Sequence, residues 1–240
     1  MKYEKDFSFV LPTRNNLDGL IKFIKSCIDK ADNKDCLEFC IVPDIDDPQL
    51  PEIKESVKDY PVRVYETHPT DNFNRDYFNW VTWKTKGRNI WCINDDAIMQ
   101  TKGWDTIINE KTKDKSLYLV DTWDSTHQHE GFSFPRFPLI SMDAVKTIGF
   151  LMFPSARTYP ADRVIWEFYK RLGLTIECHN VKVLHNHIDS GDPSKSKMYR
   201  IFQEDMKNGV FPVNCYVEDY LIRCKLAKEN PDGNQNVQVL

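Results

Sequence analysis

The chain has 240 residues and a formal net charge of −4, with 41% apolar and 28% charged residues. These values are ordinary for a soluble globular protein and allow one sizeable domain. The acidic balance gives no general attraction to nucleic acid, and no apolar run approaches the about 20 residues that a membrane-spanning helix needs.

The N-terminus and the cysteines indicate a cytoplasmic protein. The charged start MKYEKD does not resemble a signal peptide. Seven cysteines without a CxxC pair argue for reduced thiols. We therefore expect the chain to lie in the cytoplasm, that of the host cell if the gene is viral, and to have no membrane anchor.

Short apolar strands alternate with amphipathic helices in the first half of the chain. The pattern predicts strands over residues 7–12, 38–43, 62–67 and 89–93, and helices over residues 17–28 and 73–84. Strands separated by helices imply right-handed crossovers and a mostly parallel sheet. The expected fold is therefore α/β, with a Rossmann-like central sheet flanked by helices.

The second half of the chain is less regular. We expect a strand over residues 117–122 and a helix over residues 164–172 that Gly173 ends. The segment FSFPRFPLIS holds two prolines, which favours an edge strand or an extended segment over a central strand. TIEC and VKVLHNH are typical of short strands. A small C-terminal helical extension completes one domain, residues 1–228, and residues 229–240 form a flexible tail.

Polar turns follow three of the predicted strands, over residues 13–16, 44–47 and 94–96. The carboxyl ends of parallel strands meet at one edge of a sheet, and ligands of open α/β sheets bind beyond that edge. Thr13 and Arg14 in the first turn, with Asp44, Asp46 and Asp47 in the second, could bind a nucleotide through its phosphates, base or ribose. The three turns together predict a ligand site.

Asp95 and Asp96 are adjacent carboxylates in the stretch WCINDDAIMQTKGWD. Their side chains diverge at a strand end, so one can bind a cation while the other contacts a sugar or ribose hydroxyl. Mg²⁺ and Mn²⁺ prefer such sparse carboxylate sites, which substrate phosphates complete. The alternative is a surface turn, where aspartate is common. We expect the Gly103-Trp104-Asp105 turn to shape this site from beneath, with Trp104 as a packing residue.

Two further groups could carry chemistry at the same edge. His185 and His187 are two residues apart in a predicted strand, so both imidazoles share one face and could supply a metal ligand. The alternative is a structural histidine at a strand end. Asp162 begins the helix ADRVIWEFYKRLG, where it is either an N-cap or a general base.

In order and spacing, these segments resemble the GT-A glycosyltransferases of the family 2-like kind, and in size a compact, phage-type member. The resemblance spans residues 7 to about 192 and rests on FSFVLPTRN, FCIVPDIDDP, NIWCINDDAIMQTKGWD, FPLISMDAVKTIGF, PADRVIWEFYKRLG and VLHNH. It implies a single GT-A domain that moves a hexose or pentose from a nucleoside-diphosphate sugar, with a UDP-type donor favoured, to an acceptor hydroxyl.

The resemblance also implies roles for individual residues. Asp96 would bind Mn²⁺ or Mg²⁺ at the donor diphosphate, with His187 or His185 completing the metal shell. Asp95 would contact the ribose or the sugar, and Asp162 would deprotonate the acceptor. The other donor-binding residues would be Thr13, Arg14, Asp44, Asp46 and Arg75, with Asp44 or Asp46 at the base. Asn94 stands at the first position of the family's DxD motif, which puts one contact in doubt.

The acceptor and the reaction class both have alternatives. The acceptor hydroxyl could belong to a glycan, a protein or a hydroxymethylated DNA base. The same acids and histidines could instead serve a metal-dependent nucleotidyltransferase or phosphohydrolase, which would act on a triphosphate or release phosphate. A third alternative is a non-catalytic nucleotide-sugar binder, which Asn94 alone favours.

Overall fold

The computed structural model describes residues 3–125, 134–154, 156–157, 161–186, 200–201, 204 and 207–208. Its first half contains β1 (Lys5–Thr13), α1 (Leu17–Lys30), η1 (Lys34–Cys36), β2 (Leu37–Pro43), α2 (Leu50–Ser56), β3 (Val62–Val64), η2 (Asn74–Asn79), α3 (Trp80–Thr82) and β4 (Gly87–Cys92). Its second half contains β5 (Ala97–Met99), α4 (Trp104–Thr112), β6 (Leu119–Asp124), β7 (Leu139–Ser141), α5 (Met142–Ile148), α6 (Ala161–Arg171) and β8 (Thr175–His185).

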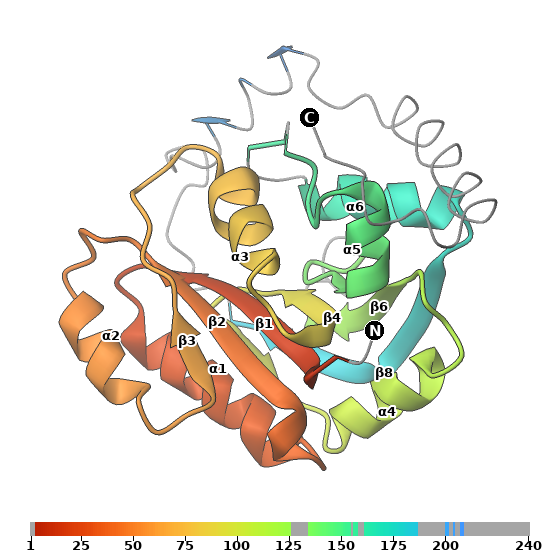
Figure 1. Cartoon of the computed structure of the whole chain (residues 1–240), viewed down its shortest axis with the longest axis horizontal. Helices are drawn as coiled ribbons and strands as arrows, with labels where there is room; N and C mark the ends of the chain where they lie inside the picture. Colours follow the sequence, from red (N-terminus) through yellow and green to blue (C-terminus); the bar gives the residue numbers. More distant parts are fainter. Residues whose placement is uncertain are drawn as a thin grey trace.

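The described strands form one sheet with the order β3-β2-β1-β4-β7-β6-β8-β5. Four of the seven pairings are parallel, among them those that join β1 to β2 and to β4. Strand β7 is antiparallel to both its neighbours, and β5 is antiparallel to β8. Helices α1, α2 and α4 pack on one face of the sheet, and η2–α3, α5 and α6 on the other (Figure 1). The predicted α/β fold with a flanked, largely parallel sheet is confirmed.

The predicted place of the FSFPRFPLIS segment is wrong. Its last three residues form β7, which lies between β4 and β6 in the middle of the sheet. Both prolines precede the strand, so neither occupies a position where a ladder N–H is needed. The Pro138 carbonyl even extends the ladder by accepting a hydrogen bond from the Cys92 amide at 3.0 Å.

The other predicted elements of the described part are present with shifted ends. TIEC and VKVLH, the described part of VKVLHNH up to His185, belong to one strand, β8, whose pairing with β6 shifts register between Thr122 and Trp123. Gly173 follows α6 with a φ of 67°, as the predicted helix stop requires. The tail over residues 229–240 and most of the C-terminal extension lie outside the described residues, so the domain bounds stay a prediction. No helix in the described ranges combines the length and the apolar character that crossing a membrane requires.

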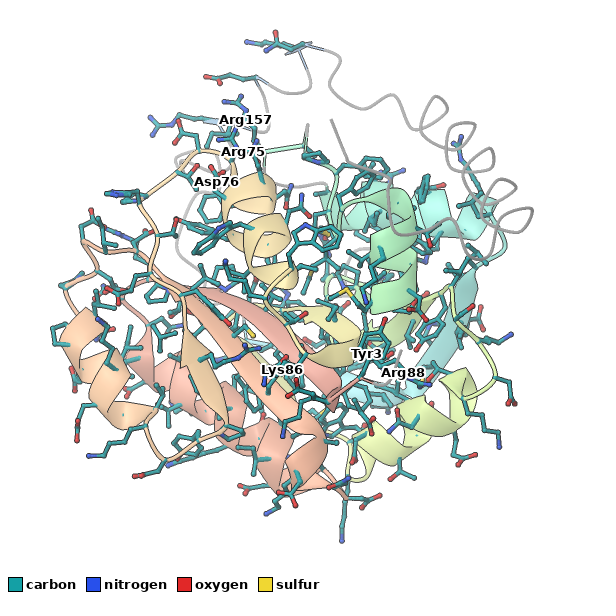
Figure 2. The ribbon with its side chains drawn as sticks, in the orientation of Figure 1. Tyr3, Arg75, Asp76, Lys86, Arg88 and Arg157 are labelled. Atoms are coloured by element: carbon teal, nitrogen blue, oxygen red, sulfur yellow. The ribbon has the colours of Figure 1, made fainter. Side chains whose placement is uncertain are left out.

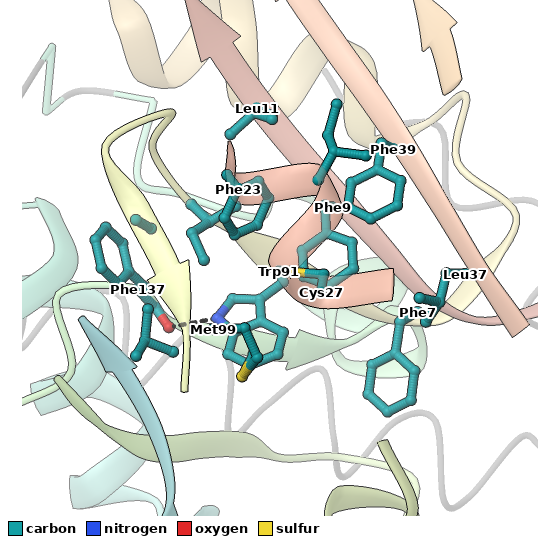
Figure 3. Close-up of a cluster of buried hydrophobic side chains, with 14 of the residues drawn as sticks. Phe7, Phe9, Leu11, Phe23, Cys27, Leu37, Phe39, Trp91, Met99 and Phe137 are labelled. Carbon is teal, nitrogen blue, oxygen red and sulfur yellow. Dashed lines mark hydrogen bonds between the residues drawn. The ribbon is translucent and has the colours of Figure 1, made fainter. Parts of the chain in front are cut away.

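Aromatic side chains fill the core on the α1 face of the sheet (Figure 3). The Phe9 ring stacks on the rings of Phe39 and Trp91, with centroid distances of 4.7 and 5.5 Å. The indole N–H of Trp91 donates to the Phe137 carbonyl at 2.9 Å, so this buried polar atom is satisfied. Because these rings come from β1, β2 and β4, their packing fixes the three strands, and therefore their carboxyl ends, relative to one another.

Trp104 is a packing residue, as expected, but its segment lies far from the polar turns. The indole is fully buried against Phe7 and Phe9. The Gly103 amide donates to the carbonyl of Lys30, the last residue of α1. Because α1 begins beside the first polar turn and has 14 residues, its end is about 20 Å from that turn. The expectation that this segment shapes the site from beneath is therefore wrong.

The aromatic core gives a stability prediction. Replacing Phe9 by alanine should lower the free energy of unfolding by about 3–5 kcal/mol, because the site cannot collapse around the cavity left between two stacked rings. Urea denaturation measures this loss. Leu184→Ala is the control: its side chain is 37% exposed, and such surface changes cost about 0.5 kcal/mol or less. Equal losses in the two variants would contradict the packing role of Phe9.

Candidate functional site

The turn after β1 presents Thr13 and Arg14 at the carboxyl edge of the sheet. Asn15 adopts a φ of 52°, a left-handed conformation that asparagine tolerates better than most residues. Asn16 then caps α1, because its side chain accepts a hydrogen bond from the Gly19 amide at 3.3 Å. A Cβ at Gly19 would lie only 2.6 Å from the Asp95 carbonyl oxygen. Glycine is therefore required for the first turn of α1 to approach the acidic pair.

Asp95 is bound to this first turn and not exposed on a free loop. The Thr13 hydroxyl donates to the Asp95 carboxylate at 2.6 Å. Burial raises the pKa of Asp95 to about 6, against the opposing effect of the hydrogen bonds from Thr13 and Asn16. The structure thus places Asp95 beside the turn with which it was predicted to share a ligand.

Arg14 and the turn after β2 form a second cluster at the same edge. The Arg14 guanidinium contacts Asp44 at 2.7 Å and Asp46 at 2.5 Å. The Tyr77 hydroxyl also donates to Asp44, which is buried. Hydrogen bonds from Arg14 lower the pKa of Asp46 and keep this carboxylate ionised. Asp47 holds the two turns together, since it accepts a hydrogen bond from the Asn15 amide at 3.0 Å.

Asp96 and His185 form the pair that fits a divalent metal. The imidazole Nε2 of His185 lies 3.3 Å from Asp96 Oδ2. The other oxygen, Asp96 Oδ1, is buried and accepts no hydrogen bond from any described residue. Such an unsatisfied carboxylate oxygen beside an imidazole matches the ligands of Mn²⁺ or Mg²⁺. Within the described ranges no three His, Cys, Asp or Glu side chains cluster around a possible metal position, so substrate oxygens would have to complete the shell.

The end of β6 connects this pair to Asp162. Ser125, which follows β6, donates from its hydroxyl to the His185 carbonyl and accepts from the His185 amide at 2.9 Å. The neighbouring residue, Asp124, accepts a hydrogen bond from the Arg136 amide at 3.1 Å. The Arg136 guanidinium in turn lies 4.0 Å from the Asp162 carboxylate. The chain of contacts therefore brings the predicted base to the same edge as the predicted metal ligands.

Asp162 has the electrostatic environment of a proton acceptor. It lies in the first turn of α6, and its side chain is 15% exposed. Burial raises its pKa to about 6, although the Arg163 amide donates to it at 2.8 Å and the Arg136 charge opposes the shift. A carboxyl with this pKa is ionised at neutral pH yet binds protons far more readily than an exposed aspartate.

The structure brings most of the predicted site residues together, with two exceptions. Arg75 binds Asp76 at 2.6 Å (Figure 2), and among the described residues no hydrogen bond joins its side chain to the clusters described above, so its contact with the donor stays a prediction. His187 lies outside the described residues, so its proposed metal contact stays a prediction.

Sequence reasoning missed several residues that organise the site. Tyr77 carried only a helical packing signal, although its hydroxyl reaches Asp44. Asp47 was expected only as a nucleotide contact, whereas the structure shows that it also joins the two turns through the Asn15 amide. Arg136 and Ser125 gave no signal, because their contacts with Asp162 and His185 depend on how distant strands pair.

Comparison with known proteins supports the fold and nothing finer. No protein-family model and no curated protein sequence matches this chain. The fold is similar to that of S. aureus TarS 1-349 in complex with UDP, with a TM-score of 0.62 at 12% identity over 96% of this chain and 73% of that chain. For the longer S. aureus TarS the TM-score is 0.62 at 11% identity, and the match covers 96% of this chain but only 44% of that one.

A second similar structure is the mannosyltransferase PcManGT from Pyrobaculum calidifontis in complex with GDP-Man and Mn²⁺. The TM-score is 0.63 at 11% identity, over 100% of this chain and 77% of that chain. At such identities the similarity shows the fold alone. It confirms the GT-A architecture that the sequence predicts, and leaves the chemistry to the residues of this chain.

The environment of Asp162 gives a prediction. Arg136→Met should raise the pKa of Asp162 above about 6, because the guanidinium that stabilises the ionised carboxylate is lost. Carbon-13 NMR titration of the side-chain carboxyl measures the change. Arg163→Met is the matched control: it keeps the main-chain amide that donates to Asp162 and should leave the pKa unchanged. A pKa that stays the same in Arg136→Met would show that this charge has no effect on Asp162.

Proposed function

We propose that the protein is a metal-dependent glycosyltransferase that moves a hexosyl or pentosyl unit from a nucleoside-diphosphate sugar to an acceptor hydroxyl. One observation carries the proposal: the Asp96–His185 pair and Asp162 are linked through the end of β6 at the edge where Asp95 and Asp44 also lie. The fold shared with a mannosyltransferase that binds GDP-Man and Mn²⁺ supports it.

The clusters at the carboxyl ends of β1 and β2 suit the nucleotide. Asp44 and Asp46 can accept hydrogen bonds from a base or ribose, and a uracil N–H suits a carboxylate acceptor, which favours a UDP-type donor. Arg14 contacts both carboxylates through one guanidinium nitrogen, Nη1. The N–H groups on its other two nitrogens can donate to phosphate oxygens. Thr13 and Asp95 would contact the ribose or the donor sugar next to it.

Asp96 and His185 would hold Mn²⁺ or Mg²⁺, with His187 as a further proposed ligand. When bound, the metal neutralises the negative charge that develops on the departing diphosphate. The role of the chain is to fix this position. The main-chain amide of Asn186 donates to the Asp96 carbonyl at 2.9 Å, and Ser125 fixes the backbone of His185.

Asp162 would act as the general base. It accepts the proton of the acceptor hydroxyl while the new bond forms between that oxygen and the anomeric carbon, and the bond from that carbon to the diphosphate oxygen breaks. Its pKa of about 6 matches this task, because the carboxylate is ionised at neutral pH and is a stronger base than an exposed aspartate. Glycan, protein and hydroxymethylated DNA all offer such a hydroxyl, and we propose the cytoplasm as the place of reaction.

Donor binding is tested by a thermal-shift panel of nucleoside diphosphates and nucleotide sugars, with Mn²⁺ or with a chelator. At a ligand concentration a hundred times the Kd, one donor should raise the melting temperature by about 5–10 °C, and only with metal. Asp96→Ala should abolish the shift, whereas the control Asp105→Asn, in the first turn of α4 and beside the segment that follows α1, should keep it. Stabilisation by a nucleoside triphosphate alone would replace this proposal by nucleotidyl transfer.

The base is tested by kinetics. Asp162→Asn should lower kcat by about 10²–10⁴-fold with the donor thermal shift unchanged. In the native protein, kcat should fall as the pH drops below about 6, because the raised pKa means that the carboxyl is protonated, and cannot accept a proton, below that value. Measurement of kcat between pH 5 and 8 checks both points. Full activity of Asp162→Asn would exclude this residue as the base.

A further inference from the structure

A cavity of about 590 Å³ opens between the segment that follows β3 and the η2–α3 helix. Its walls include Thr67, Thr70, Asp76, Trp80 and Trp83. None of the residues that bind the acidic pair or Asp162 lines it. Arg75, which also lines the cavity, appears with Asp76 at the end of the helix in Figure 2.

The η2–α3 helix contributes residues to both the cavity and the candidate active site. Tyr77 points from η2 to Asp44. Asp76, Trp80 and Trp83 follow one another at spacings of four and three residues and line the cavity together, so they share one side of the helix, about a quarter turn from Tyr77. Segment η2 is π-helical, a conformation that occurs frequently at functional sites. The cavity therefore adjoins the turn that holds Asp44, because Thr67 lines the cavity and its backbone pairs with that of Asp44.

Two indole rings lie open in this cavity. Trp80 is 42% exposed and Trp83 is 49% exposed, and they are two of the four large apolar side chains that lie exposed in the described part of the chain. Trp80 has a fixed orientation, because the Tyr65 ring packs against it at 6.2 Å and the Lys84 ammonium lies 5.0 Å from its centroid. Two exposed indoles in one concave site indicate a ligand that has an apolar face.

The polar part of the cavity wall carries paired charges. The Arg75 guanidinium donates to Asp76 at 2.6 and 3.0 Å, and the Thr70 hydroxyl donates to the same carboxylate. A guanidinium has five N–H donors, so Arg75 keeps donors for a ligand beyond those that bind Asp76. Because the charges of Arg75 and Asp76 compensate each other, this pair offers directional hydrogen bonds and adds no net charge to the cavity.

We propose that this cavity is a saccharide-binding subsite in which Trp83 and Trp80 pack against the apolar C–H face of a pyranose while Arg75 and Asp76 bind its hydroxyls. A pyranose has this combination of an apolar face and a rim of donors and acceptors. A nucleobase also has an apolar face, but it has fewer hydrogen-bonding groups around its rim than a pyranose. A nucleotide would in addition bring the negative charge of its phosphates into the cavity. The volume lies within the range of small-ligand sites.

Saccharide binding at this cavity does not depend on the proposed function. The role of the cavity as an acceptor subsite does rest on it. If the protein transfers sugars, the subsite makes a glycan the acceptor class and holds it away from the reacting hydroxyl. The acceptor would then span from the cavity towards Asp162, and longer saccharides would be better acceptors than single sugars.

The test is isothermal titration calorimetry of the full chain with maltotetraose, cellotetraose, chitotetraose and mannotetraose. At least one should bind, and Trp83→Ala should weaken it by about tenfold, equal to about 1.4 kcal/mol. Trp123→Ala, which removes a partly exposed indole on β6, is the matched control and should keep the native affinity. Unchanged melting temperatures of both variants show that they fold.

The outcomes separate this inference from the proposed function. The subsite is excluded if none of the four saccharides binds or if Trp83→Ala binds as the native protein does. It is also excluded if Trp83→Ala weakens UDP or single-stranded DNA instead, because the cavity would then serve a nucleotide. The metal-dependent thermal shift with UDP in the same Trp83→Ala variant reports on the donor site alone. Its loss in Asp96→Ala but not in Trp83→Ala leaves the proposed function standing, whatever the saccharides do.

Discussion

Strand β1 holds the candidate site together because it pairs in parallel with both β2 and β4. Parallel pairing brings the carboxyl ends of the three strands to one edge, so the turns that follow them must meet there. Thr13 reaches Asp95 and Arg14 reaches Asp44 across these neighbouring strands. The stacked rings of Phe9, Phe39 and Trp91 pack the three strands together below this edge. The aromatic core therefore fixes the relative positions of the turns that carry the site residues.

The three carboxylates that matter are stabilised in different ways, and the differences suit their proposed tasks. Asp95 accepts a hydrogen bond from the Thr13 hydroxyl, and its pKa of about 6 leaves it ionised, and therefore an acceptor, at neutral pH. Asp96 keeps a buried oxygen without a hydrogen-bond donor among the described residues, a cost that a cation would offset. Asp162 is largely buried, and the Arg136 charge offsets only part of the resulting rise in its pKa, which therefore lies near 6. Two of the three groups thus have pKa values raised by burial, which is characteristic of functional sites.

The sequence predicts the first half of the fold well because its signals there are local. Buried strands separated by helices, and polar residues at the ends of those strands, can be recognised without knowledge of tertiary structure. Strand β7 shows the limit: two prolines favour an edge strand, but only the pairing with β4 and β6 reveals that both stand before the ladder. Arg136 and Ser125 show the same limit for the site, since their partners are 26 and 60 residues away in sequence and nothing local marks them.

The η2–α3 helix is the element through which the proposed saccharide subsite and the proposed donor site are related. Two buried asparagines fix it to the segment before α6: Asn74 donates to the Ala156 carbonyl, and Asn79 donates to the Met152 carbonyl at 2.7 Å while accepting from the Leu151 amide. Buried side-chain amides without hydrogen-bond partners would destabilise the fold, so these bonds hold the helix against the segment before α6. Tyr77 and Trp83 on this helix are therefore held at a constant separation. A saccharide that bound at the cavity would lie at a fixed distance from a nucleotide at Asp44, which is the geometric condition for the proposed acceptor and donor to meet at the proposed base, Asp162.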